Sequence, residues 1–237
     1  MDRRTGAADR RSRPADRRKT ALALAALLCA AVPACTAGPP APAAVAAPPA
    51  LAARVTPVPP DRLAGSHHPG CPVPADRLRL IRMNHWGFDG KVHRGEMVVH
   101  ESAVEPVLKA FGSAFEARFP IRRMRVMAAY GGDDPAAMAD DNTSAYNCRP
   151  VTGRPDRRSQ HSYGDAVDVN PLENPYVDRT GTVHPPGADG HLGHRDAARP
   201  GVLVASSALT RAFREAGWEW GGRWSPPDYQ HFSRNGR

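Results

Sequence analysis

The most informative stretch of the sequence is Ser159-Gln160-His161-Ser162-Tyr163-Gly164-Asp165-Ala166-Val167-Asp168-Val169-Asn170. Its second half predicts a strand whose side chains point alternately to two faces. Val167 and Val169 share one face and favour a hydrophobic core. Ala166, Asp168 and Asn170 share the other face, so we expect Asp168 to line a cavity in which the small Ala166 leaves space. A carboxylate in such a place is costly unless a cation partners it.

A set of metal ligands can be assembled around this strand. His161 precedes it, and Gly164 allows a tight turn between His161 and Asp168. Towards the end of the sequence, His231 offers a third ligand, and Asp228 lies three residues before it. Two imidazoles and one carboxylate leave the fourth position of a zinc ion open for water, which is typical of catalytic sites. Asp228 is then the candidate base, which takes the proton of that water and passes it to the leaving amine.

The net charge of +8 is concentrated in a leader. Residues 1–20 contain eight basic and three acidic side chains, so the rest of the chain carries only about +3. The charge therefore gives no support for a nucleic-acid partner. The apolar run at 20–32 is too short for a membrane span, which needs about 20 residues. We expect residues 1–35 to be a signal peptide or a lipoprotein leader lipidated at Cys35, with an uncleaved anchor as a further alternative.

Residues 36–70 are rich in Ala and Pro and predict a disordered linker, because such a segment buries too little apolar surface to fold. The folded domain is expected over 71–237, which is long enough for one core. It contains Cys71 and Cys148, and export to an oxidising compartment favours a disulfide between them. Two buried free thiols are the alternative.

The remaining pattern predicts an α+β fold with a small antiparallel sheet flanked by helices. One helix is expected to begin at a capping box formed by Ser102 and Glu105 and to end at Pro120. A second helix is expected over 207–216, with Gly217 as its C-terminal stop. The expected strands, besides the one that carries Asp168, are 78–83, 96–100, 123–129, 218–220 and 229–233.

The sequence resembles the zinc peptidases of the M15 family in two motifs, Ser-x-His-x-x-Gly-x-Ala-x-Asp at 159–168 and Asp-x-x-His at 228–231. The strings at 141–153 and 168–176 resemble an exported bacterial subgroup, and the likeness spans roughly residues 71–237. The family comprises D-alanyl-D-alanine carboxypeptidases and dipeptidases and L-alanyl-D-glutamate endopeptidases of cell walls and phage lysins. The resemblance implies a Zn²⁺ ion held by His161, Asp168 and His231, with Asp228 as the base, and an α+β fold shared with the hedgehog signalling domain.

The resemblance implies two further roles. Ser159 stands where a serine helps to hold substrate in relatives. Relatives also carry an arginine near the scissile carbonyl, usually after a strand well upstream of the first histidine, but residues 129–132 lack it. Arg149 is the nearest substitute, since the expected Cys71–Cys148 disulfide would fix its position and its planar guanidinium suits a carboxylate or an oxyanion. A surface arginine outside the site is the alternative.

These observations predict a zinc-dependent peptidase that hydrolyses amide bonds in peptidoglycan stem peptides. Aspartate at 228 favours an L-alanyl-D-glutamate endopeptidase, and a D-alanyl-D-alanine carboxypeptidase is the second choice. A non-catalytic, zinc-containing, wall-binding lipoprotein is the alternative, because a fold does not fix a function. We expect a monomer that is secreted or held at the cell envelope and whose partner is a peptidoglycan peptide. No nucleic-acid partner is expected, and the membrane is contacted only through the leader or a lipid anchor.

Overall fold

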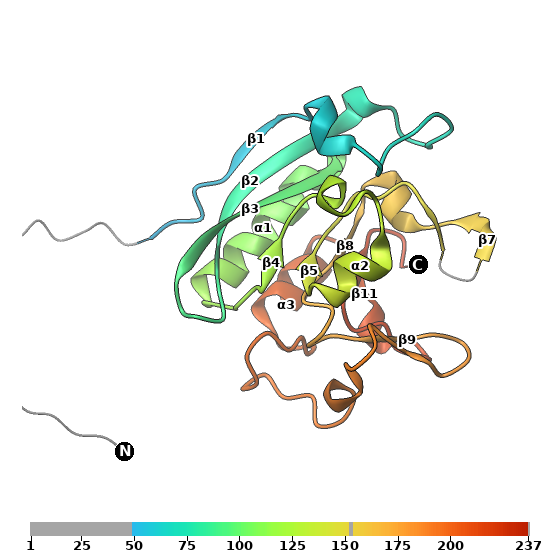
Figure 1. The fold of residues 1–237 in the computed structure, drawn as a ribbon. Coiled ribbons are helices and arrows are strands. Elements are labelled where there is room, and N and C mark those ends of the chain that lie inside the picture. The colour runs from blue at the N-terminus through green and yellow to red at the C-terminus, as the bar shows by residue number, and fades with distance from the viewer. Residues whose placement is uncertain (1–48, 152–153, 237) are drawn as a thin grey trace, which may run out of the picture. The chain divides into compact units, whose positions relative to one another are not determined.

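The computed structural model describes residues 49–151 and 154–236 (Figure 1). The predicted leader at 1–35 and the first part of the predicted linker lie outside these residues. The described residues combine helices with several small sheets, so the α+β prediction is confirmed at that level. None of the described helices has the length and apolar character that crossing a membrane requires.

The folded part begins well before Cys71, so the predicted linker is too long. Strand β1 (Arg54–Pro57) pairs antiparallel with β2 (Leu78–Trp86). A short 3₁₀ helix (Pro60–Leu63) follows, and its Leu63 is buried. The Pro-rich composition conceals these elements, because an edge strand and a 3₁₀ turn both tolerate proline.

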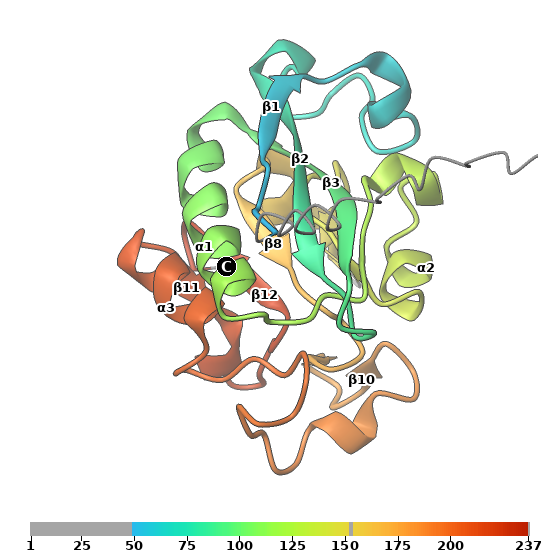
Figure 2. The ribbon, with the colours of Figure 1, turned by 90° about the vertical axis from the view of Figure 1, so that its left-hand side faces the viewer.

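The sheet β1-β2-β3 contains the two longest strands. β2 and β3 (Val92–His100) have nine residues each and pair antiparallel along their full length. Both extend beyond the strands predicted at 78–83 and 96–100. One face of this sheet packs against helix α1 (Val104–Glu116) in the main hydrophobic core, as Figure 2 shows.

Helix α1 begins differently from the prediction, because Ser102 and Glu105 form no capping box. A 3₁₀ turn (Glu101–Ala103) precedes the helix, and the His100 imidazole accepts the backbone N–H of Ser102 at 3.2 Å. The Ser102 hydroxyl is itself hydrogen-bonded to His100 Nδ1 at 2.8 Å. The helix ends at Glu116, and Phe111 is buried as the helical spacing predicts.

The second three-stranded sheet has the order β11-β12-β8, with β8 (Ala166–Asp168), β11 (Glu219–Trp220) and β12 (His231–Ser233). Strands β11 and β12 are shorter than the strands predicted at 218–220 and 229–233. Val167 and Phe232 enter the main core beside helix α3 (Ala208–Glu215), which begins after Ser207. α1 and α3 pack together, with Phe111 edge-on to Phe213 at a ring separation of 6.3 Å. This core fixes the strands that carry the candidate ligands.

Three two-stranded pairs and helix α2 (Asp134–Ala139) complete the described part. The predicted strand at 123–129 is wrong beyond Met124, because Met127–Tyr130 form a 3₁₀ helix that stops at the left-handed Gly131. The predicted small sheet is therefore several separate sheets. The pairs are β4 (Arg123–Met124) with β5 (Asn142–Thr143), β6 (Pro150–Val151) with β7 (Arg154–Arg158), and β9 (Tyr176–Val177) with β10 (Val183–His184).

Candidate metal centre

Strand pairing places two of the candidate ligands side by side. His231 lies directly opposite Asp168 in the antiparallel β12–β8 pair, and its Nδ1 is 2.9 Å from Asp168 Oδ1. His161 comes from the 3₁₀ turn Gln160–Tyr163, which ends at Gly164 with a φ of 72°. A Cβ at Gly164 would lie 2.6 Å from the backbone nitrogen of His100, so only glycine lets this turn approach β3. The turn carries the His161 side chain towards β8.

The three side chains fit a single small cation. His161 Nε2 is 3.0 Å from Asp168 Oδ2 and 3.3 Å from His231 Nδ1. Donors about 2.1 Å from a tetrahedral zinc ion are about 3.4 Å apart, which is close to these separations. All three residues are buried and converge as a ligand group. The His161 Nδ1–H donates to the carbonyl of Ala145 at 2.6 Å, which leaves the Nε2 lone pair free to bind a metal.

Charge in the cluster also favours a cation. Burial raises the pKa of Asp168, but the charge of His161 and hydrogen bonds from both histidines outweigh it and hold the pKa well below its usual range. Burial lowers the pKa of His161, and the neighbouring Asp168 carboxylate more than offsets this effect, so the net shift is upward. Asp168 therefore remains an anionic ligand at neutral pH.

Asp228 stands beside the cluster with one oxygen unengaged. Its backbone N–H donates to Gly221 at 2.9 Å, and its carbonyl accepts from the His231 N–H at 3.4 Å. Its Oδ1 is buried without a hydrogen-bond partner among the described residues. Burial raises the pKa of Asp228 to about 7; His231 opposes the shift and the charge of Asp168 adds to it. A carboxyl group with such a pKa can accept and release a proton near neutral pH.

The cluster opens into a cleft of about 520 Å³. Ser159, Arg149, Trp224 and Asp228 all line it, together with the three candidate ligands. The Ser159 hydroxyl accepts the backbone N–H of His161 at 3.3 Å, so it caps the turn that carries this histidine. The structure thus brings the six residues predicted to bind metal, bind substrate or take part in catalysis to one cavity.

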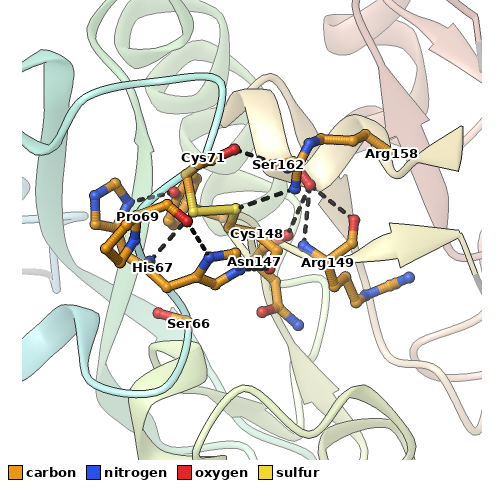
Figure 3. Close-up of a disulfide and its surroundings, with 12 residues drawn as sticks. Ser66, His67, Pro69, Cys71, Asn147, Cys148, Arg149, Arg158 and Ser162 are labelled. Carbon is orange, nitrogen blue, oxygen red and sulfur yellow. Dashed lines mark hydrogen bonds between the residues drawn. A yellow bond between two sulfur atoms is a disulfide. The ribbon is translucent and has the colours of Figure 1, made fainter. Parts of the chain in front are cut away.

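The disulfide between Cys71 and Cys148 is present, which confirms that prediction. Figure 3 shows Arg149 directly after this bridge, with its backbone N–H donating to the Ser162 hydroxyl at 3.0 Å. The Arg149 side chain is mostly buried and forms a 2.7 Å ion pair with Asp134. It is therefore a fixed cleft residue rather than a loose surface arginine.

Sequence reasoning missed six charged residues of the cleft, namely Asp134, Arg154, Arg157, Arg158, Asp178 and Arg179. Asp134 is the first residue of α2, far in sequence from the histidine motif. Arg157 belongs to β7 and Arg179 follows β9. Only the density of arginine at 154–158 could have signalled a functional surface there.

Comparison with known proteins identifies a family that is similar to the segment containing the candidate ligands. Residues 152–234 match the model of a peptidase M15 family described as D-alanyl-D-alanine carboxypeptidase. The matched segment contains all three candidate ligands and Asp228. No curated protein and no solved structure matches the chain. This segment of the chain is therefore similar to the M15 peptidases, and it is the segment that supplies the candidate ligands.

Proposed function

We propose that this protein is a zinc-dependent peptidase that hydrolyses amide bonds in peptidoglycan stem peptides. The observation that carries the proposal is the convergence of His161, Asp168 and His231 beside the partly unengaged Asp228 in one cleft. The proposal includes a hedgehog/D,D-peptidase-like fold and a place outside the cell or at its envelope, reached through residues 1–35.

The residues divide the work as follows. His161, Asp168 and His231 would hold Zn²⁺, which supplies polarisation of the scissile carbonyl and acidification of water when bound. Asp228 accepts a proton from the attacking water and returns it to the leaving amine. Arg149, held by Asp134, donates hydrogen bonds to the carbonyl oxygen as negative charge develops there. Ser159 fixes the turn of His161 and borders the bound peptide.

Two bonds compete as the scissile one. An aspartate base at 228 favours the L-alanyl-D-glutamate bond, whereas the description of the matching family names the D-alanyl-D-alanine bond. Both lie in the same stem peptide, so one substrate can carry both tests.

The decisive experiment incubates the purified chain with a defined muropeptide pentapeptide and identifies the products by mass spectrometry. We expect cleavage that a chelator abolishes and that added Zn²⁺ restores. Asp228→Asn should still bind zinc but lose cleavage, which separates a peptidase from a zinc-containing wall-binding protein. If no divalent metal supports cleavage, and the wild type and Asp228→Asn bind the wall equally, the peptidase proposal is refuted.

A further inference from the structure

Arginine side chains surround the cleft. They come from two separate two-stranded sheets and from the segment after the disulfide. Most of the cleft's acidic groups are already engaged: Asp168 contacts the histidines, and Asp178 bonds His184 at 2.9 Å. The arginines that line the cleft are Arg149, Arg154, Arg157, Arg158 and Arg179.

Three of these arginines have partners that hold them in the fold. Arg149 pairs with Asp134 at 2.7 Å, and Arg154 pairs with Asp156 at 3.2 Å. Arg158 donates to the carbonyl of Gly70 at 2.7 Å, beside the disulfide.

Arg157 and Arg179 differ from the other three. Both are exposed, and within 49–151 and 154–236 neither makes an ion pair or a side-chain hydrogen bond. Among the described residues neither guanidinium has a bonding partner, so we treat each as available to a ligand in the cleft. The two arginines reach the same cleft from different segments, Arg157 from strand β7 and Arg179 from the turn between β9 and β10.

We propose that Arg157 and Arg179 form an anion subsite of the cleft that selects acidic peptides, by binding a free carboxylate away from the scissile bond. This inference rests on the proposed peptidase function. The guanidinium fork matches a carboxylate with two parallel hydrogen bonds. The shared cleft favours a peptide as the ligand, because the same chain segment could then reach Asp228 and the two arginines together.

The subsite contributes to binding more than to the chemical step. An exposed ion pair contributes only a small free energy of binding, and salt screens it. Two arginines acting together should therefore lower KM for an acidic peptide by about threefold to tenfold and leave kcat nearly equal. The preference should fade as ionic strength rises.

The test compares two muropeptides that differ only in whether their free carboxylates are amidated. For the wild-type chain we expect kcat/KM to be about threefold to tenfold higher on the acidic peptide. The double variant R157E/R179E should lose this preference through KM. R54E is the matched control, since Arg54 is an exposed arginine on β1 outside the cleft. Its preference should equal that of the wild type.

Equilibrium binding tests the arginine subsite independently of whether the protein cleaves peptides. Calorimetric titration of each peptide into the zinc-loaded Asp228→Asn chain, with and without R157E/R179E, measures the same preference without catalysis. Tighter binding of the acidic peptide that R157E/R179E abolishes supports the subsite, even if neither peptide is cleaved. Equal binding of both peptides overturns the subsite and leaves the peptidase standing if both are cleaved. Tighter binding of an oligonucleotide or a polyphosphate than of the acidic peptide also overturns it.

Discussion

The two halves of the described chain are built in different ways. Residues 49–120 contain the long strands β2 and β3 and the 13-residue helix α1. The described residues after 120 contain strands of two to five residues, the short helices α2 and α3, and the turns and loops between them. Among the described residues, Ser66 and His85 are the buried polar side chains of the first half, whereas the other buried polar side chains lie in the second.

This difference separates the part of the fold that mainly provides stability from the part that carries the candidate site. The first half is stabilised by apolar burial along regular elements, which needs no particular side-chain chemistry. The second half buries polar groups, and these must be paired to be tolerated. All the candidate ligands and the candidate base belong to the second half. Substitutions should therefore separate stability from activity along the same boundary.

The largest expected effect is on the metal centre itself. Replacing His161 by Ala removes one of three ligands, so bound zinc per chain should fall to near zero. Amide hydrolysis should drop by about a thousandfold or more, because the Lewis acid is lost. Elemental analysis and product assays measure both quantities. A variant that keeps its zinc and its rate would show that the cluster is not the catalytic site.

The matching change in the first half is Phe111→Ala. Phe111 is buried between the sheet and α3, so we expect the free energy of unfolding to fall by about 3–5 kcal/mol. Zinc affinity of the folded fraction should not change. Urea titration at saturating zinc measures the loss, and Leu108→Ala, a half-buried position on the same helix, should cost less. A large fall in zinc affinity would break the division between the halves.

The Cys71–Cys148 disulfide links the two halves across 77 residues of sequence. Replacing both cysteines by Ser should lower the free energy of unfolding by about 2–4 kcal/mol, since the unfolded chain gains freedom. It should also reduce kcat, because Arg149 follows Cys148 directly. A variant with lower stability but full kcat would show that the bridge does not position Arg149.

The elements that could be predicted from the sequence are those with a strong period. The apolar spacing around Phe111 and Phe213 predicts α1 and α3, and both lie close to the predicted residues. β1 could not be predicted, because its stability comes from pairing with β2 rather than from its own Pro-rich sequence. The residues after Met124 resemble a strand in composition, but a left-handed Gly131 ends a 3₁₀ turn there instead.

The metal cluster was more accessible to sequence reasoning than the rest of the cleft. His161 and Asp168 share one short motif, and a single strand pairing adds His231. Asp134 begins helix α2 and Arg179 lies in the turn after β9, and both reach the cleft only through tertiary contacts, so no local spacing identifies them. Local patterns thus predict the ion site, while the substrate-facing residues require the fold.

A smaller effect is expected at Asp134, which holds Arg149 at 2.7 Å. Asp134→Asn removes the charge but keeps the shape, so we expect kcat to fall by about tenfold with little change in KM. Asp134→Glu should recover part of the loss. Asp133→Asn is the control, because asparagine caps α2 as well as aspartate does. Equal kinetics for Asp134→Asn and the control would show that Arg149 does not depend on the ion pair with Asp134 for its role in catalysis.

The last expected effect is a pH dependence of stability at Glu173, in the second half. Burial, followed by a hydrogen bond with Asp141, raises the pKa of Glu173 to about 7, although Arg122 opposes the shift. The folded state then holds a proton that the unfolded state releases above about pH 4.5, so this group's contribution to stability falls as pH rises towards 7. Glu173→Gln cannot titrate, so its stability relative to the wild type should increase between pH 4.5 and 7, by about 1.4 kcal/mol for each unit by which the folded state raises the pKa of Glu173. Urea unfolding across this range measures the change, with the exposed Glu116→Gln as control. A constant difference would mean that Glu173 has the same pKa in the folded and the unfolded state, and that its burial does not disfavour the ionised form.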